Sequence, residues 1–234
     1  LHPFKKVFGL AMSKVIEINT FKEVLDHLEE GTHLFLDVDN TLIQPIHDFG
    51  SIPWEANLNR RFLALGLSEE EATRRSCAIW RAIQKVSEAK PVEEETQALL
   101  LALKKQGYPL IAITARSSDM IPTTKRQLAS LEIPIDIIIH CGDTPKVEYL
   151  LSHLGSNKPK VVFVDDSRGH LDLAAEILPG HNIPFVGLRY GYLDHHVKNY
   201  APDPFSHLLH QAFTHPEAVE AILEGLTDLF KEQE

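Results

Sequence analysis

Leu34-Phe35-Leu36-Asp37-Val38-Asp39-Asn40-Thr41 is the stretch that decides the fold. It begins as a short apolar run and ends in two acidic residues, an amide and a hydroxyl. A short continuous apolar run is typical of a strand that is buried on both faces, as in a parallel sheet covered by helices. We therefore expect a buried strand here, with polar residues at its carboxyl end.

Four further apolar runs have the same character and follow along the chain at 110–113, 135–139, 161–164 and 184–188. Helical stretches precede or separate them at about 20–30, 93–106, 119–131 and 145–154, and the first opens with the capping box of Thr20 and Glu23. Strands that alternate with helices indicate βαβ units. The sequence therefore predicts an α/β fold built on a doubly wound parallel sheet.

One segment, residues 53–90, interrupts this alternation. It has the pattern of two helices, divided by Gly66 and restarted by the capping box of Ser68 and Glu71. Apolar positions at helical spacing favour an antiparallel helical pair. We therefore expect an α/β core formed by 12–44 and 91–234, and a connecting segment with a small α-helical cap at 45–90, inserted after the first strand.

Polar residues gather at the predicted carboxyl ends of four strands, where open α/β sheets bind their ligands. In chain order these residues are Asp37 and Asp39, then Thr114, then Lys146 at the start of a helix, then Asp165 and Asp166. Each alone has a structural explanation as a turn, a helix cap or a solvated side chain. Together they place several carboxylates at one edge, which would repel one another without a cation, and oxygen ligands of this kind suit Mg²⁺.

Two other lysines, Lys158 and Lys160, also precede the second acidic pair. Lys160 would begin the strand that ends at Asp165, about 16 Å away at roughly 3.3 Å per residue, and so would lie at the opposite edge of the sheet. Lys146 begins a helix after the third strand and lies at the acidic edge. We therefore expect Lys146 to be the lysine of the site.

This order of residues, spread over 34–166, resembles the four signature motifs of the haloacid dehalogenase (HAD) superfamily. The inserted helices resemble its helical cap, and the segment 187–192 is similar to a bacterial branch of the superfamily whose members are largely uncharacterised. The resemblance implies a Mg²⁺-dependent phosphatase that hydrolyses the phosphate monoester of a small phosphorylated substrate.

The resemblance also assigns a role to each residue. Asp37 would be the nucleophile that forms an aspartyl-phosphate, and Asp39 would be the general acid and base. Thr114 and Lys146 would hold the phosphoryl oxygens. The Mg²⁺ ligands would be the Asp37 carboxylate, the Asp39 main-chain carbonyl and Asp165, with Asp166 bound directly or through water.

Three alternatives stay open at this stage. A phosphotransferase or phosphomutase of the same superfamily differs only in the fate of the aspartyl-phosphate, although small sugar mutases usually carry Gly-Val where this chain has Asn40-Thr41. A catalytically silent HAD-like binding protein is the second. A response-regulator receiver is the third. In receivers the acidic pair comes first and is followed by Asp, Thr and Lys, whereas here Lys146 precedes a second acidic pair. A dinucleotide-binding Rossmann domain is excluded, because no Gly-x-Gly-x-x-Gly follows a strand.

Composition limits the partners. Hydrophobic residues make up 44% of the chain, as in folded globular proteins, and the net charge of −10 disfavours nucleic acid. No apolar run approaches the roughly 18 to 20 residues that would span a membrane.

We expect a cytoplasmic protein, with a secreted or periplasmic location as the alternative because residues 1–11 have the pattern of a signal-peptide tail. The sequence leaves the substrate's identity and the oligomeric state open.

The thirteen histidines raise the question of a zinc site. His195 and His196 are adjacent, whereas His207 and His210 fall in a helix that we expect to be exposed, with no acidic third ligand nearby. We therefore expect solvated histidines.

Overall fold

The computed structural model describes residues 12–231, so the predicted signal-peptide tail at 1–11 lies outside the described residues. The chain divides into two compact units. Unit 1 comprises the described residues up to Thr41, Glu95–Ser118 and Ile133–Gly191, and unit 2 comprises Leu42–Glu94, Asp119–Glu132 and the described residues from Tyr192 onward. The predicted cap at 45–90 falls in unit 2, which also takes in two segments that the prediction assigned to the core.

Unit 1 is built on a six-stranded sheet in the order β1-β8-β7-β2-β5-β6, and every neighbouring pair is parallel. The strands are β1 (Ser13–Ile18), β2 (His33–Leu36), β5 (Leu110–Thr114), β6 (Ile137–His140), β7 (Val161–Asp165) and β8 (Phe185–Tyr190). The predicted α/β class with a parallel sheet is confirmed. The stretch that decided the fold is β2, which lies between β7 and β5.

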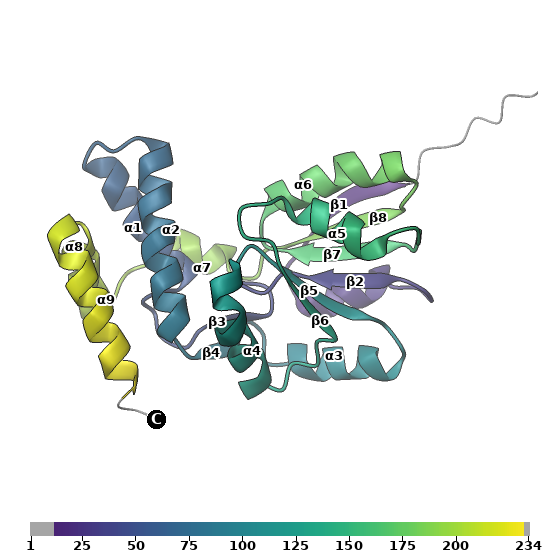
Figure 1. Ribbon diagram of the computed structural model, residues 1–234, viewed down its shortest axis with the longest axis horizontal. Coiled ribbons are helices and arrows are strands. Elements are labelled where there is room, and N and C mark those ends of the chain that lie inside the picture. The colour runs from purple at the N-terminus through teal and green to yellow at the C-terminus, as the bar shows by residue number, and fades with distance from the viewer. Residues whose placement is uncertain (1–11, 232–234) are drawn as a thin grey trace, which may run out of the picture. The chain divides into compact units, whose positions relative to one another are not determined.

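Helices cover both faces of this sheet, with α5 and α6 on one side and α3 on the other (Figure 1). The helical elements of unit 1 are η1 (Phe21–His27), α3 (Thr96–Lys105), α5 (Lys146–Leu154), α6 (Arg168–Ile177) and η3 (Leu178–His181). Phe35 and Phe163 pack with Val147 of α5 and Leu171 of α6 in one core cluster. Two covered faces explain why the strands are apolar at consecutive positions.

The strand β1 was not predicted from the sequence. It lies at the edge of the sheet and pairs only with β8, so part of its surface stays exposed and its sequence includes Lys14 and Glu17. The strand β2 ends at Leu36, so Asp37 and Val38 follow the strand. The helix expected at 20–30 is the shorter 3₁₀ helix η1, with its predicted capping box.

Unit 2 contains the predicted helical pair, bracketed by a two-stranded antiparallel ribbon of β3 and β4. Its elements are β3 (Ile43–Pro45), α1 (Ile52–Ala64), α2 (Glu69–Val86), β4 (Ala89–Pro91), α4 (Ile121–Ser130, after the short η2, Ser118–Met120), α7 (Asp194–Lys198), α8 (Pro204–Phe213) and α9 (Pro216–Lys231). Gly66 has a positive φ of 88° between α1 and α2, and the hydroxyl of Ser68 accepts a hydrogen bond from the Glu71 amide.

The helices α8 and α9 lie beside α1 and α2 because they share an apolar core (Figure 1). Trp54 and Leu58 of α1 pack with Ile83 of α2 and with Leu209 and Phe213 of α8. This shared core explains why the C-terminal helices belong to the same unit as the predicted cap.

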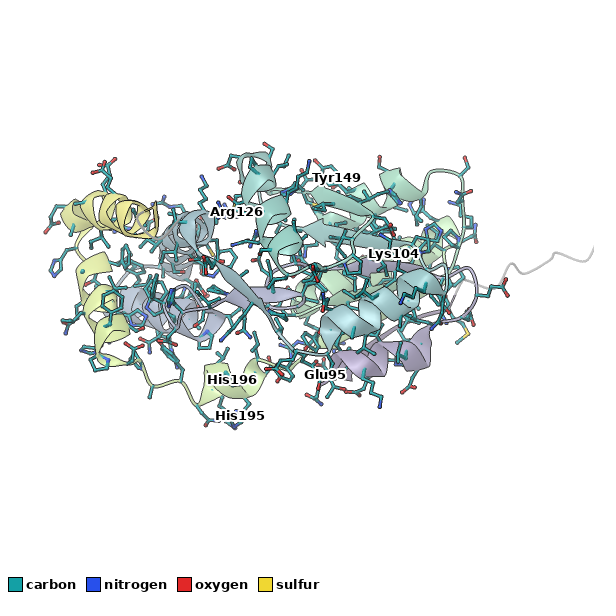
Figure 2. All side chains as sticks on the ribbon, turned by 90° about the horizontal axis from the view of Figure 1, so that it is seen from below. Glu95, Lys104, Arg126, Tyr149, His195 and His196 are labelled. Atoms are coloured by element: carbon teal, nitrogen blue, oxygen red, sulfur yellow. The ribbon has the colours of Figure 1, made fainter. Side chains whose placement is uncertain are left out.

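His210 corrects the prediction of solvated histidines. It is fully buried, its ring stacks on Trp54 with 4.7 Å between centroids, and its Nε2 lies 2.9 Å from the Trp54 carbonyl oxygen. His195 and His196 are exposed on α7, as expected (Figure 2). His210 is therefore part of the core of unit 2.

Candidate active site

Three neighbouring strands of unit 1 bring the predicted residues to one edge of the sheet. Asp37 directly follows β2, Thr114 ends β5 and Asp165 ends β7, and these three strands are adjacent. The amide of Asp37 still donates to the carbonyl of Val164 at 2.9 Å, which fixes Asp37 beside β7. The parallel direction of the strands thus places side chains far apart in sequence at a common edge.

Lys146, at the start of α5, lies between two of these carboxylates. Its Nζ is 2.6 Å from Oδ1 of Asp37 and 2.8 Å from Oδ2 of Asp165, and its side chain is 3% exposed. Burial alone would lower the pKa of Lys146, but attraction to the two carboxylates outweighs it and raises the pKa. Lys160 pairs instead with Glu29, at 3.4 Å between Nζ and Oε1. The buried ammonium of Lys146 is therefore the positive charge in contact with Asp37 and Asp165.

Three carboxylates form a group with metal-site dimensions. One oxygen each from Asp37, Asp165 and Asp166 lies within 4.8 Å of the other two. Burial raises the pKa of Asp37 to about 6, against the opposing effect of Lys146. Burial, together with repulsion from Asp37 and Asp165, raises the pKa of Asp166 well above its usual range. Burial is the main cause in both acids, and repulsion between neighbouring carboxylates adds to it.

Asp165 is the most firmly held of the three. It is fully buried, and its Oδ1 accepts a hydrogen bond from the amide of Ser167 at 2.8 Å. Nδ1 of His170, in the first turn of α6, lies 3.0 Å from Oδ2. Burial would raise the pKa of Asp165, but Lys146 and His170 outweigh it and lower the pKa. His170 was not identified from the sequence.

Thr114 is buried in a tight turn at the end of β5. Its Oγ1 accepts a hydrogen bond from the amide of Arg116 at 3.1 Å, and its carbonyl accepts one from the amide of Cys141 at 2.8 Å. These two hydrogen bonds fix the side chain and the carbonyl group of Thr114.

Asp39 lies at the same edge but makes different contacts from Asp37. Its two carboxylate oxygens accept hydrogen bonds from Nε and Nη2 of Arg116, at 2.8 and 2.7 Å. The next residue, Asn40, has a φ of 62°, in the left-handed region that asparagine tolerates better than most residues. Arg116 was not identified from the sequence. Its position two residues after Thr114 places a positive charge near the acidic edge, and this could have indicated it.

A small cavity of about 250 Å³ adjoins Lys146 and His170. Its other lining residues are Ala115, Gly142, Asp143, Thr144, Pro145, Val147 and Leu173. Open space therefore lies beside the lysine of the carboxylate cluster.

The charges at this edge do not balance. Among the described residues, Lys146 contacts Asp37 and Asp165 and Arg116 contacts Asp39, while His170 beside Asp165 is charged only if protonated. With Asp166 included, two negative charges are left over when all four acids are ionised and His170 is neutral. A single divalent cation would balance them, and carboxylate oxygens are the ligands that Mg²⁺ prefers. The donor set of the site fits this ion.

Proteins similar over most of the chain occur in chlamydiae, under the name "Putative outer membrane protein". The one from Chlamydia trachomatis serovar D is 23% identical over 218 residues, covering 82% of this chain and 83% of the relative. The one from Chlamydia muridarum is 23% identical over 243 residues and covers 93% of each. In the part of this chain that the structure describes, no helix combines the length and apolar character needed to cross a membrane.

Solved structures with some similarity include a HAD-superfamily hydrolase of subfamily IA from Geobacter sulfurreducens. Its TM-score is 0.41 at 22% identity, with coverage of 70% of this chain and 97% of that chain. A predicted phosphoglycolate phosphatase from Haemophilus somnus has a TM-score of 0.42 at 16% identity and covers 71% of this chain and 97% of its own.

The family model that matches is described as "Protein of unknown function (DUF2608)", and it matches residues 17–144 and 139–219. These matches cover most of the chain, so the chain belongs to the DUF2608 family.

Proposed function

We propose that this protein is a Mg²⁺-dependent phosphohydrolase that cleaves a phosphate monoester through an aspartyl-phosphate on Asp37. One observation carries the proposal. A buried lysine contacts Asp37 and Asp165, and Asp37, Asp165 and Asp166 have the spacing of a metal site at the carboxyl ends of adjacent strands. The order of these residues along the chain, which resembles the HAD motifs, supports the same reaction.

The metal would be held by the carboxylates of Asp37 and Asp165 and by the main-chain carbonyl of Asp39, with Asp166 bound directly or through water. Bound there, Mg²⁺ would neutralise charge on the carboxylates and on the phosphoryl oxygens. The spacing of the three carboxylates supports the assignment, because one oxygen from each lies within 4.8 Å of the other two.

Asp37 would act as the nucleophile. An Oδ atom of its carboxylate attacks phosphorus in line, the bond from phosphorus to the ester oxygen breaks, and an aspartyl-phosphate forms. The attack needs the ionised carboxylate, and burial works against ionisation, since it raises the pKa of Asp37 to about 6. The ammonium of Lys146, 2.6 Å away, favours the ionised form.

Lys146 and Thr114 would bind the transferred phosphoryl group. The ammonium can share its protons between Asp37 and a phosphoryl oxygen, which stabilises the charge that this group carries during transfer. The hydroxyl of Thr114 already accepts a hydrogen bond from the amide of Arg116. Its own O–H can therefore donate to a phosphoryl oxygen.

Asp39 would move the protons. In the first half-reaction it donates a proton to the leaving oxygen, and in the second it takes a proton from the water that attacks the aspartyl-phosphate. Hydrolysis then releases inorganic phosphate and restores the Asp37 carboxylate. A phosphotransferase would pass the phosphoryl group to another acceptor instead, and no contact in the described residues favours that outcome over water.

We further propose a small phosphorylated molecule as the substrate.

The names of the chlamydial relatives agree better with the secreted or periplasmic alternative than with the cytoplasmic location expected from the sequence. Fractionation of the source cells with an antibody against the chain would decide between the two locations.

The test is a panel of phosphate monoesters, including 4-nitrophenyl phosphate, assayed with Mg²⁺ and with EDTA. We expect phosphate release with Mg²⁺ and none with EDTA. Release at the same rate in metal-free buffer would exclude the metal, and failure to hydrolyse any ester would favour the catalytically silent alternative.

A further inference from the structure

Arg116 and Asp39 form a two-point ion pair in unit 1. Nε of Arg116 donates to Oδ2 of Asp39 at 2.8 Å, and Nη2 donates to Oδ1 at 2.7 Å. The side chains are 2% and 16% exposed, so the arginine is buried and the aspartate is mostly shielded from water. Two parallel hydrogen bonds to a carboxylate fix its plane as well as its position, which a single contact does not do.

The backbone that carries Arg116 is itself held in place. Its amide donates to Oγ1 of Thr114 at 3.1 Å, and its carbonyl accepts from the amide of Gly142 at 3.3 Å. The guanidinium therefore extends from a fixed turn after β5 toward the residues that follow β2. A side chain presented in this way loses little further conformational entropy when it binds a carboxylate.

A purely structural role explains this pair poorly. Burying a guanidinium and a carboxylate costs several kcal/mol of desolvation per ion, and well-packed apolar residues often stabilise a fold as much or more. Asp39, moreover, is the residue to which the proposed function gives the proton transfers. An ion pair at this position fixes the orientation of the carboxylate that must face the leaving oxygen.

We infer that Arg116 is a positioning residue, which fixes the Asp39 carboxylate for proton transfer in both half-reactions. The inference rests on the proposed function, because it gives Arg116 an effect on the reaction only through Asp39. Its consequence depends on the ester. A basic leaving group, such as an alkoxide, needs a proton from Asp39, whereas 4-nitrophenolate leaves without one.

The experiment measures single-turnover formation and decay of the phosphate label on Asp37, in wild type and in Arg116→Gln. From an alkyl phosphate we expect label formation to slow by about 10- to 100-fold, part of the 10² to 10⁴ that general acid catalysis contributes. From 4-nitrophenyl phosphate, formation should stay within about threefold of wild type, because no proton transfer is needed. Decay of the label should slow with either ester, since water must still lose a proton.

A double-mutant cycle tests whether Arg116 acts through Asp39. In the Asp39→Asn background, Arg116→Gln should cause no further slowing of alkyl-ester cleavage, since the carboxylate that it positions is gone. Arg116→Lys keeps the positive charge but not the two parallel N–H donors, so its rate of alkyl-ester cleavage should lie between those of Arg116→Gln and wild type. If Arg116→Gln does not fold, the rates of label formation and decay are measured in Arg116→Lys instead. Arg168→Gln is the matched control, because Arg168 binds Asp172 and Glu17 at an exposed site of the same unit.

Other outcomes would overturn the inference. Equal slowing with both esters, together with weaker inhibition by inorganic phosphate, would show that Arg116 binds the phosphoryl group itself. Unchanged rates in both Arg116 variants, or additive losses in the cycle, would leave it without a positioning role. Failure of the proposed function looks different, because the wild-type protein would then form no label from either ester.

Discussion

Nζ of Lys146 lies 2.6 Å from Oδ1 of Asp37, although 109 residues separate the two along the chain. Both side chains are buried, and the same ammonium is 2.8 Å from Oδ2 of Asp165. The lysine therefore has two effects that can be separated: it keeps two buried carboxylates from repelling each other, and it would bind the phosphoryl group.

We expect Lys146→Met to remove activity and to destabilise unit 1. Without the ammonium, Asp37 and Asp165 face each other as buried acids that no lysine neutralises, and breaking a buried pair typically costs about 3 to 5 kcal/mol. Because Mg²⁺ would neutralise the same carboxylates, it should stabilise this variant. Thermal unfolding with and without Mg²⁺ measures the effect, and kcat/KM on an aryl phosphate should fall by at least about 100-fold.

Lys160→Met is the matched control, since Lys160 pairs with Glu29 at 3.4 Å and this glutamate is mostly exposed. Its unfolding free energy should change by no more than about 0.5 kcal/mol, and its activity should not change. A Lys146→Met protein with wild-type activity would rule out the assigned role of this lysine.

The second prediction concerns metal binding at Asp165. Mg²⁺ at about one hundred times its dissociation constant should stabilise the wild-type protein by about 2.7 kcal/mol. Asp165→Asn should lose most of this stabilisation, because an amide is a weaker ligand for Mg²⁺ than a carboxylate. Differential scanning calorimetry across a Mg²⁺ titration measures both values.

Asp172→Asn serves as the comparison, since Asp172 is an exposed partner of Arg168. It should keep the full response to Mg²⁺. If Asp165→Asn lost stability in metal-free buffer while its Mg²⁺ affinity stayed at the wild-type value, Asp165 would be a structural residue only.

Much of the fold could be predicted from the sequence, because burial on both sides of the sheet leaves continuous apolar runs, such as residues 161–164 of β7. The strand β1 has no such run. It lies at an edge, where Lys14 and Glu17 interrupt the apolar residues, so the signal that identified the other strands is absent. The C-terminal helices were not assigned to the cap unit, because their contacts with Trp54 join segments about 150 residues apart.

The residues of the candidate site could be predicted where a reactive side chain stands at the end of a predicted strand. Asp37, Thr114 and Asp165 end or follow strands whose direction the βαβ pattern fixes, so the edge they share follows from the sequence. Arg116 lies in the turn after β5 and His170 lies in the first turn of α6, and no spacing rule identifies either position. Their contacts with Asp39 and Asp165 depend on side-chain packing that only the structure gives.

The third prediction concerns pH and His210. Burial lowers the pKa of His210 to about 4, against the opposing effect of its hydrogen bond to the Trp54 carbonyl, whereas the ordinary value is 6.5. Between these values the unfolded chain binds a proton that the folded chain does not. The contribution of His210 is therefore fully present above pH 6.5 and is lost as the pH falls toward 4, by about 2 kcal/mol at pH 5.

Thermal unfolding between pH 7.5 and 5 tests this in wild type and in His210→Gln. The variant cannot titrate, so its unfolding free energy should fall less steeply over this range. His195→Gln, at an exposed position on α7, should keep the wild-type slope. Equal slopes in wild type and His210→Gln would contradict the prediction.

The last prediction separates Asp37 from Asp39. Asp37→Asn should abolish turnover, because an amide cannot form the aspartyl-phosphate. Asp39→Asn should keep the main-chain carbonyl proposed for Mg²⁺ but lose the proton transfers, which typically contribute about 10² to 10⁴ in rate. With 4-nitrophenyl phosphate it should still form the intermediate and then stall, since water must lose a proton to release phosphate. Acid quenching with a labelled ester should therefore trap phosphate on Asp37 in Asp39→Asn and not in Asp37→Asn. If Asp39→Asn instead cleaved alkyl phosphates at the wild-type rate, Asp39 would not be the acid and base, even with Asp37 essential.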